Sequence, residues 1–87
     1  MLTSNWLREC ADKVTCNYVL AYGLTGSRLW QAVRRELAKF GRVYENPRAD
    51  PRFMVYAGDR IFAVWVAVES GPVSKAVVTA VVEYRAV

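Results

Sequence analysis

Hydrophobic positions recur with two different periods along this chain, and the change falls near Gly41. Apolar side chains in the segment 24–42 recur every three or four residues, which predicts an amphipathic helix. These positions are Leu29, Val33, Leu37 and Phe40. Thr25 or Ser27 is suited to cap its start, and Gly41 to end it in the left-handed conformation.

Two shorter segments precede this helix. Residues 2–14 carry Leu7, Ala11 and Val14 at helical spacing, which predicts a first helix capped by Thr3 or Ser4. In residues 16–24 aromatic and aliphatic side chains alternate, which favours a strand. Leucine and alanine in the same segment leave a helix open as the alternative.

After Gly41 the period changes to two. Residues 42–45 are a short predicted strand, and the loop 46–52 follows with two prolines that cannot donate to a central ladder. Residues 53–69 form a predicted hairpin that turns at residues 57–59. Its second strand, residues 60–69, is apolar on both faces, which is typical of a strand covered on both sides. A long final strand occupies the segment 74–87.

These elements predict the α+β class, with one or two N-terminal helices packed on an antiparallel β-meander of about four strands. The chain, residues 1–87, is expected to be a single domain. Trp30, Phe40 and Trp65 are expected in its core. One face of the final strand is expected to carry Ala76, Val78, Ala80, Val82 and Tyr84.

The composition suits a small folded domain with a modest basic excess. Hydrophobic residues make up 54% of the 87 residues, and twelve Lys and Arg against eight acids give a net charge of +4. Nine of the twelve cations are arginine, the residue best suited to phosphate and carboxylate recognition. A chain this short has a limited core, so apolar surface buried in a homodimer or against another protein is also expected.

The residue types present exclude several chemistries. The chain has no histidine, so a Ser-His-Asp or Cys-His triad is excluded. No motif for a zinc site, another metal or a cofactor is visible, and none is expected. The longest apolar run, residues 61–68, is too short to span a bilayer. A cytoplasmic protein with two reduced thiols, Cys10 and Cys16, is the simpler interpretation, and one disulfide is the alternative.

Arginines and aromatic residues are interleaved in the middle of the chain, a mixture that suits single-stranded RNA. The candidate nucleic-acid-binding residues are Arg34, Arg35, Arg42, Arg60, Tyr44 and Tyr56. Arg60 and Arg42 also have structural explanations, at the rim of the sheet and at a helix end. Arg48 and Arg52 have none, because they lie in the proline-bounded loop, where Asp50 is a candidate ion-pair partner for either.

The phrases "GRVYENP", "RFMVYAGDRIFAVWV" and "VVTAVVEYR" give residues 27–87 a resemblance to small ribonuclease toxins of the RelE and colicin ribonuclease type. That resemblance implies RNA cleavage without a metal or cofactor. It also implies that Arg48 and Arg52 stabilise phosphate and that Tyr84 or Arg85 assists proton transfer.

Two function classes therefore stay open. The first is a small basic domain that acts on RNA, with ribonuclease activity undecided. The second is a non-enzymatic protein-binding module, such as a small phage- or plasmid-type inhibitor or assembly protein, which is either dimeric or docked on another protein. A basic aromatic surface around Arg48, Arg52 and Arg60 favours the first, and an exposed apolar face on the final strand favours the second.

Overall fold

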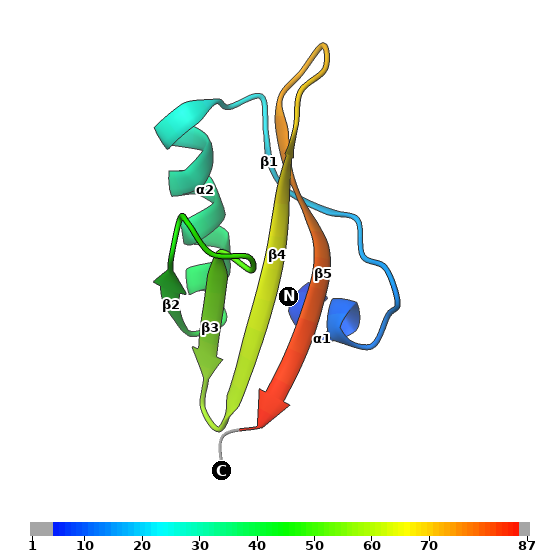
Figure 1. Ribbon diagram of the computed structural model, residues 1–87, viewed down its shortest axis with the longest axis vertical. Coiled ribbons are helices and arrows are strands. Elements are labelled where there is room, and N and C mark those ends of the chain that lie inside the picture. Colours follow the sequence, from blue (N-terminus) through cyan, green and yellow to red (C-terminus); the bar gives the residue numbers. More distant parts are fainter. Residues whose placement is uncertain (1–4, 86–87) are drawn as a thin grey trace.

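The computed structural model describes residues 5–85, which form two helices and five strands (Figure 1). In chain order these are α1 (Trp6–Ala11), β1 (Tyr18–Tyr22), α2 (Gly26–Ala38), β2 (Arg42–Glu45), β3 (Phe53–Ala57), β4 (Arg60–Glu69) and β5 (Lys75–Arg85). The predicted α+β class is confirmed, and residues 18–22 form a strand rather than a helix. Neither helix of this part of the chain has the length and apolar content needed to cross a membrane.

All five strands belong to one antiparallel sheet in the order β1-β5-β4-β3-β2. Strands β2 to β5 form the predicted meander, in which each strand pairs with the next along the chain. The first strand adds to the free edge of β5, so the sheet has one strand more than the four expected. Helix α2 contacts both edge strands, β1 and β2, and the sheet therefore curls around it (Figure 1).

Both helices pack against the same face of the sheet. Trp6 of α1 stacks on Tyr18 at 4.8 Å between ring centroids and meets Phe40, just after α2, at 5.2 Å. The helix residues Leu7, Leu29, Val33 and Leu37 join Phe53, Val55, Phe62 and Val64 of the sheet in one buried cluster. Trp30 and Phe40 pack against this cluster as predicted. The other face of the sheet has no helix of the described chain over it.

Strand β4 is therefore covered on one side only, which corrects two expectations. The apolar residues on both faces of β4 predicted cover on both sides, but Val64 belongs to the helix-side core and Trp65 does not. Successive strand residues point to opposite faces, so Trp65 lies on the uncovered side. The prediction that Trp65 is a core residue is wrong, because the helices within residues 5–85 cover only the other face of its strand.

A bulge in β5 also changes the predicted faces of the final strand. Trp65 pairs with Ala80 while the next residue, Val66, pairs with Val78, so Thr79 has no counterpart on β4. The extra residue shifts the alternation by one position. Ala76 and Val78 consequently lie in the core, whereas Ala80, Val82 and Tyr84 lie on the uncovered side. The prediction that these five residues share one face of the final strand is therefore wrong beyond Val78.

The glycines and caps differ in detail from expectation. Gly41 does not have a positive φ, and a Cβ there would overlap the Tyr56 carbonyl oxygen, so glycine is required for close backbone approach. Asn5 caps α1 by accepting from the Arg8 backbone N–H at 3.4 Å. The predicted caps Thr3 and Ser4 lie outside the described residues. Thr25 precedes α2, but its side chain makes no capping hydrogen bond.

Cys10 and Cys16 form a disulfide, so the interpretation of two reduced thiols is wrong. Helix α1 ends at Ala11, and the chain turns back until the two Cα atoms are 5.4 Å apart, within the range that a disulfide requires. Both cysteines are buried in the main core cluster. The bridge therefore fastens α1 to the segment that leads into β1.

Candidate functional site

The uncovered side of the sheet is its most unusual surface, and we call it the outer face. Strand register and alternation assign its members. They are Val19, Tyr22, Arg42, Tyr44, Met54, Tyr56, Ile61, Ala63, Trp65, Ala67, Glu69, Lys75, Val77, Ala80, Val82 and Tyr84. Thirteen of these sixteen residues are apolar or aromatic, and the other three lie near its two ends.

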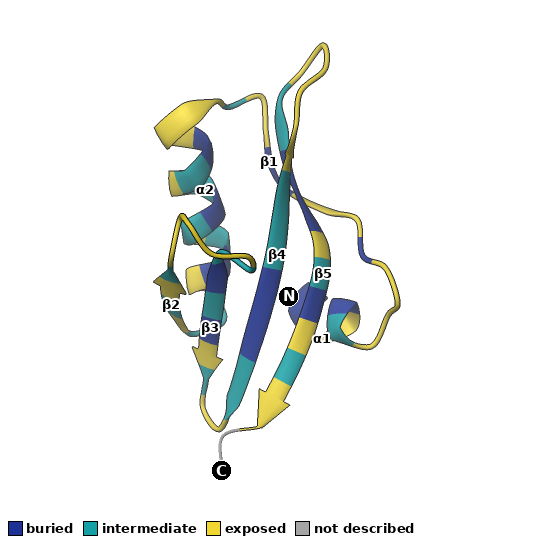
Figure 2. Ribbon diagram, viewed as in Figure 1, coloured by how far each residue is buried: buried dark blue, intermediate teal, exposed yellow. Residues whose placement is uncertain are grey.

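The outer face is separate from the core of the domain. Ala63 and Val77 are buried, yet neither belongs to the helix-side cluster, so neighbouring outer-face side chains shield them. Tyr84 is 51% exposed, Tyr56 41% and Val82 39%, and β5 is exposed toward its C-terminal end (Figure 2). A contiguous apolar surface of this kind is rare on a monomeric soluble protein and usually marks an interaction site.

Three of the six predicted nucleic-acid-binding residues meet at one corner of this face. Arg42 on β2 pairs directly with Tyr56 on β3, and its guanidinium Nη1 donates to the Tyr44 hydroxyl at 3.4 Å. The two tyrosine rings pack edge to face with centroids 5.0 Å apart. The hydrogen bond to Tyr44 raises the pKa of Arg42, with a further coulombic contribution from the same tyrosine. The corner therefore holds one permanent cation beside two exposed aromatic rings.

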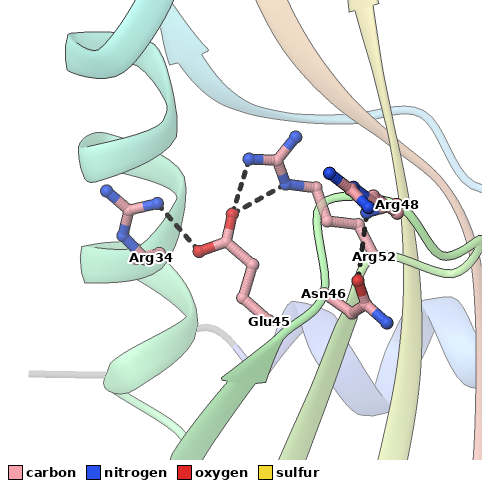
Figure 3. Close-up of polar contacts among 5 residues, drawn as sticks. All are labelled: Arg34, Glu45, Asn46, Arg48 and Arg52. Carbon is pink, nitrogen blue, oxygen red and sulfur yellow. Dashed lines mark hydrogen bonds and ion pairs between the residues drawn. The ribbon is translucent and has the colours of Figure 1, made fainter.

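Arg52, by contrast, is held in a cluster on the helix side (Figure 3). Its Nε donates to Glu45 Oε2 at 2.7 Å, and its Nη2 lies 2.6 Å from the same oxygen. Arg34 of α2 occupies the other carboxylate oxygen at 2.9 Å. The Arg52 guanidinium also lies over the Trp30 ring, 3.7 Å from its centroid. Both arginines thus join α2 and the loop 46–52 to β2, and Asp50 is not the ion-pair partner of Arg52.

The remaining basic candidates are dispersed. Arg48 is exposed, and only its backbone N–H is engaged, donating to Asn46 Oδ1 at 3.1 Å (Figure 3). Arg35 is exposed on α2. Arg60 forms an ion pair with Glu83 at 3.1 Å, which fits its predicted place at the rim of the sheet. The structure therefore does not gather Arg48, Arg52 and Arg60 into one basic surface.

Tyr84 and Arg85 lie away from the arginine loop. Tyr84 pairs with Ile61 on the outer face, and Arg85 pairs with Arg60, so the two point to opposite sides of the sheet. Phe53, the residue after Arg52, pairs with Val64, about 10 Å along β4 from Ile61 at the usual rise per strand residue. The four residues expected to act in catalysis do not converge on one point.

Within residues 5–85 no group of three or more Cys, Asp or Glu side chains is arranged to hold a metal ion. Comparisons with protein-family models, with curated proteins and with solved structures found no match to this chain.

The sequence pattern missed the outer face as a site. The signal was present, since β4 is apolar on both faces, but periodicity alone does not say whether the second face meets a helix of the same chain. The bulge at Thr79 then moves Ala80, Val82 and Tyr84 onto that same surface. An exposed apolar end of the final strand is the feature expected of the second function class, a protein-binding module, and not of a domain that acts on RNA.

Proposed function

We propose that this chain is a non-enzymatic protein-association module that docks through its outer face. The observation that carries the proposal is the apolar composition of that face, which no helix among the described residues covers. Burial of apolar area is the main driving force of protein association, and exposed Tyr, Trp and Met are the residue types enriched at interfaces. Tyr56, Tyr84, Trp65 and Met54 supply all three types on the outer face.

The distribution of charge supports a protein partner over a nucleic acid. Of the chain's twelve cations, only Arg42 and Lys75 occupy outer-face positions, and Lys75 lies 3.8 Å from Glu69. Binding to nucleic acid depends on several cations that neutralise neighbouring phosphates. The outer face carries one cation that is not beside a carboxylate, Arg42, which gives little attraction for a phosphate backbone.

The positions of the predicted catalytic residues also support a role without chemistry. A ribonuclease that works without a metal needs cations and a proton-transfer group around one phosphate. Arg52 is occupied by Glu45 and Trp30, and Tyr84 lies on the opposite side of the sheet. Of the two arginines in that loop, only Arg48 is exposed.

RNA binding is the second candidate function, favoured by the corner of Arg42, Tyr44 and Tyr56. Aromatic rings on an open sheet accept stacked bases, and an adjacent arginine holds phosphate. The corner has this composition over two strands only, and the one further cation of the outer face, Lys75, lies beside Glu69 near the β4–β5 hairpin.

Incubation of the protein with single-stranded RNA in EDTA distinguishes the two functions. We expect no cleavage, and weak retention that salt removes and that is the same for Tyr56→Ala as for the wild type. The matched control is Arg35→Ala on α2, which removes an exposed cation far from the outer face. Cleavage that Arg48→Ala abolishes, or retention that Tyr56→Ala abolishes and Arg35→Ala preserves, would contradict the proposal and establish the RNA function.

A further inference from the structure

We infer that the partner of the outer face is a second copy of this chain, in a two-fold dimer that packs one outer face on the other. The inference rests on the proposed function and names its partner. Two-fold dimers are the commonest protein assemblies, and they require a surface that is complementary to itself. The outer face meets that requirement in composition and in the placement of its charges.

The whole chain exposes more surface than a compact monomer of its mass. A compact monomer of 9.8 kDa is expected to expose about 5,200 Å². This chain exposes 5889 Å², about 700 Å² more than that relation gives. A standard interface buries about 800 Å² on each partner. The protruding β4–β5 hairpin (Figure 1) contributes to this excess, and a second copy on the outer face would lower the exposed area of each chain toward that of a compact protein.

The placement of charge allows two positively charged copies to meet on this side. A net charge of +4 on each copy opposes association, but ten of the twelve cations lie outside the outer face. Those of α2, such as Arg28 and Arg35, are on the far layer of the domain. The centre of the outer face, around Ala63, Val82 and Trp65, carries no charge, so its burial leaves no charged group unpaired.

The outer face carries a cation at one end and a carboxylate beside a lysine at the other. Arg42 lies at the end beside the β3–β4 turn, and Glu69 lies at the opposite end, where its carboxylate is 3.8 Å from Lys75 and accessible to a further cation. In a two-fold dimer, if Arg42 contacts Glu69 of the second copy, Glu69 contacts Arg42 of that copy in return. The same pair is thereby made twice, which suits a second copy better than an unrelated apolar partner.

Sedimentation equilibrium from low micromolar to near-millimolar protein tests the inference, with a matched pair of valine variants. Val82→Arg places a charge at the centre of the outer face, where the valine is 39% exposed and a long side chain can be accommodated without unfolding the monomer. Val68→Arg makes the same change on the helix side of β4, at a residue that is 47% exposed. Circular dichroism and urea unfolding verify that both variants fold.

We expect a wild-type dimer and a similar dimer for Val68→Arg. We expect Val82→Arg to raise the dissociation constant of the dimer about a hundredfold or more. A wild type that stays monomeric throughout, or a dimer that Val82→Arg leaves intact, overturns the inference. A monomer that also fails to bind RNA through Tyr56 rejects the second copy alone and leaves the proposed function standing. RNA retention that depends on Tyr56 rejects both.

Discussion

Val64 and Trp65 are neighbours in β4, yet Val64 is fully buried beneath the helices and Trp65 is only partly buried, on the outer face. Trp65 has the larger side chain of the two, yet it is the one that no helix of the described residues covers. Burial of a tryptophan contributes more than burial of a valine, so a domain that keeps the valine inside and leaves the tryptophan outside has a second surface to bury. This contrast is the basis of the proposed association.

Arg52 and Arg48 are expected to differ in their effect on stability. Arg52→Ala removes an ion pair with Glu45 and the stacking on Trp30, so it should lower the free energy of unfolding by about 1–2 kcal/mol. Arg48→Ala should change it by less than about 0.5 kcal/mol, because its side chain is exposed. Urea unfolding measures both variants. Equal effects would show that the cluster around Glu45 does not hold the loop in solution.

Gly41 is expected to be less tolerant of substitution than Gly23. The added methyl group of Gly41→Ala overlaps the Tyr56 carbonyl, and the strand must move, at a cost of about 2 kcal/mol or more. Gly23 has φ of 80° and open space around it, so Gly23→Ala should cost only about 1 kcal/mol for the left-handed backbone. Thermal unfolding of the two variants compares them, and the reverse order would contradict the packing of β2 on β3.

The Cys10–Cys16 disulfide is expected to stabilise the attachment of α1. It closes a short loop, for which chain entropy predicts about 2 kcal/mol, and a Cys10→Ala/Cys16→Ala double variant should lose that amount. Urea unfolding with and without a reductant measures the loss in the wild type, and the double variant is the control that a reductant should not affect. Alkylation of both thiols in the native, unreduced protein would contradict the bridge.

Charge reversal tests the orientation of the proposed dimer. Arg42→Glu and Glu69→Arg should each weaken dimerisation roughly tenfold, because each places like charges together twice. The double variant Arg42→Glu/Glu69→Arg restores opposite charges and should recover the wild-type dissociation constant at the same ionic strength. Lys39→Glu on the helix side is the control for net charge. If the double variant dimerises as weakly as the two single variants, Arg42 and Glu69 do not contact each other across the interface.

Much of the fold was predictable because the hydrophobic period is a local property. The spacing of apolar residues around Leu29 and Val33 is enough to predict a helix, and the alternation from residue 42 onward is enough to predict strands. The bulge at Thr79 was not predictable, since it depends on which residues β4 and β5 place opposite each other. A single extra residue there decides whether Val82 faces the core or the outer surface.

The candidate site was less predictable because its interactions are long-range. Asp50 is nearer to Arg52 in the sequence than Glu45 is, but the pairing of β2 with β3 brings Glu45 to the guanidinium. The disulfide likewise depends on where the chain turns after α1. Apolar residues on both faces of β4 were visible in the sequence, but only the arrangement of the helices shows that one face is uncovered.

Association of two copies through their outer faces can be observed directly at Ile61, the only isoleucine in the chain, which lies on the outer face. Protein labelled with carbon-13 at the Ile61 δ1 methyl is mixed with an equal amount of unlabelled protein at a concentration where the dimer forms. Isotope-filtered NOE spectra then report only contacts between copies. Ile61 shares a cross-strand row with Arg42, which the proposed dimer places against Glu69 of the other copy. We therefore expect NOEs from this methyl to side chains toward the β4–β5 hairpin end of the other copy's outer face, such as Val77 and Val19. A dimer that shows no intermolecular NOE at Ile61 would contradict this arrangement.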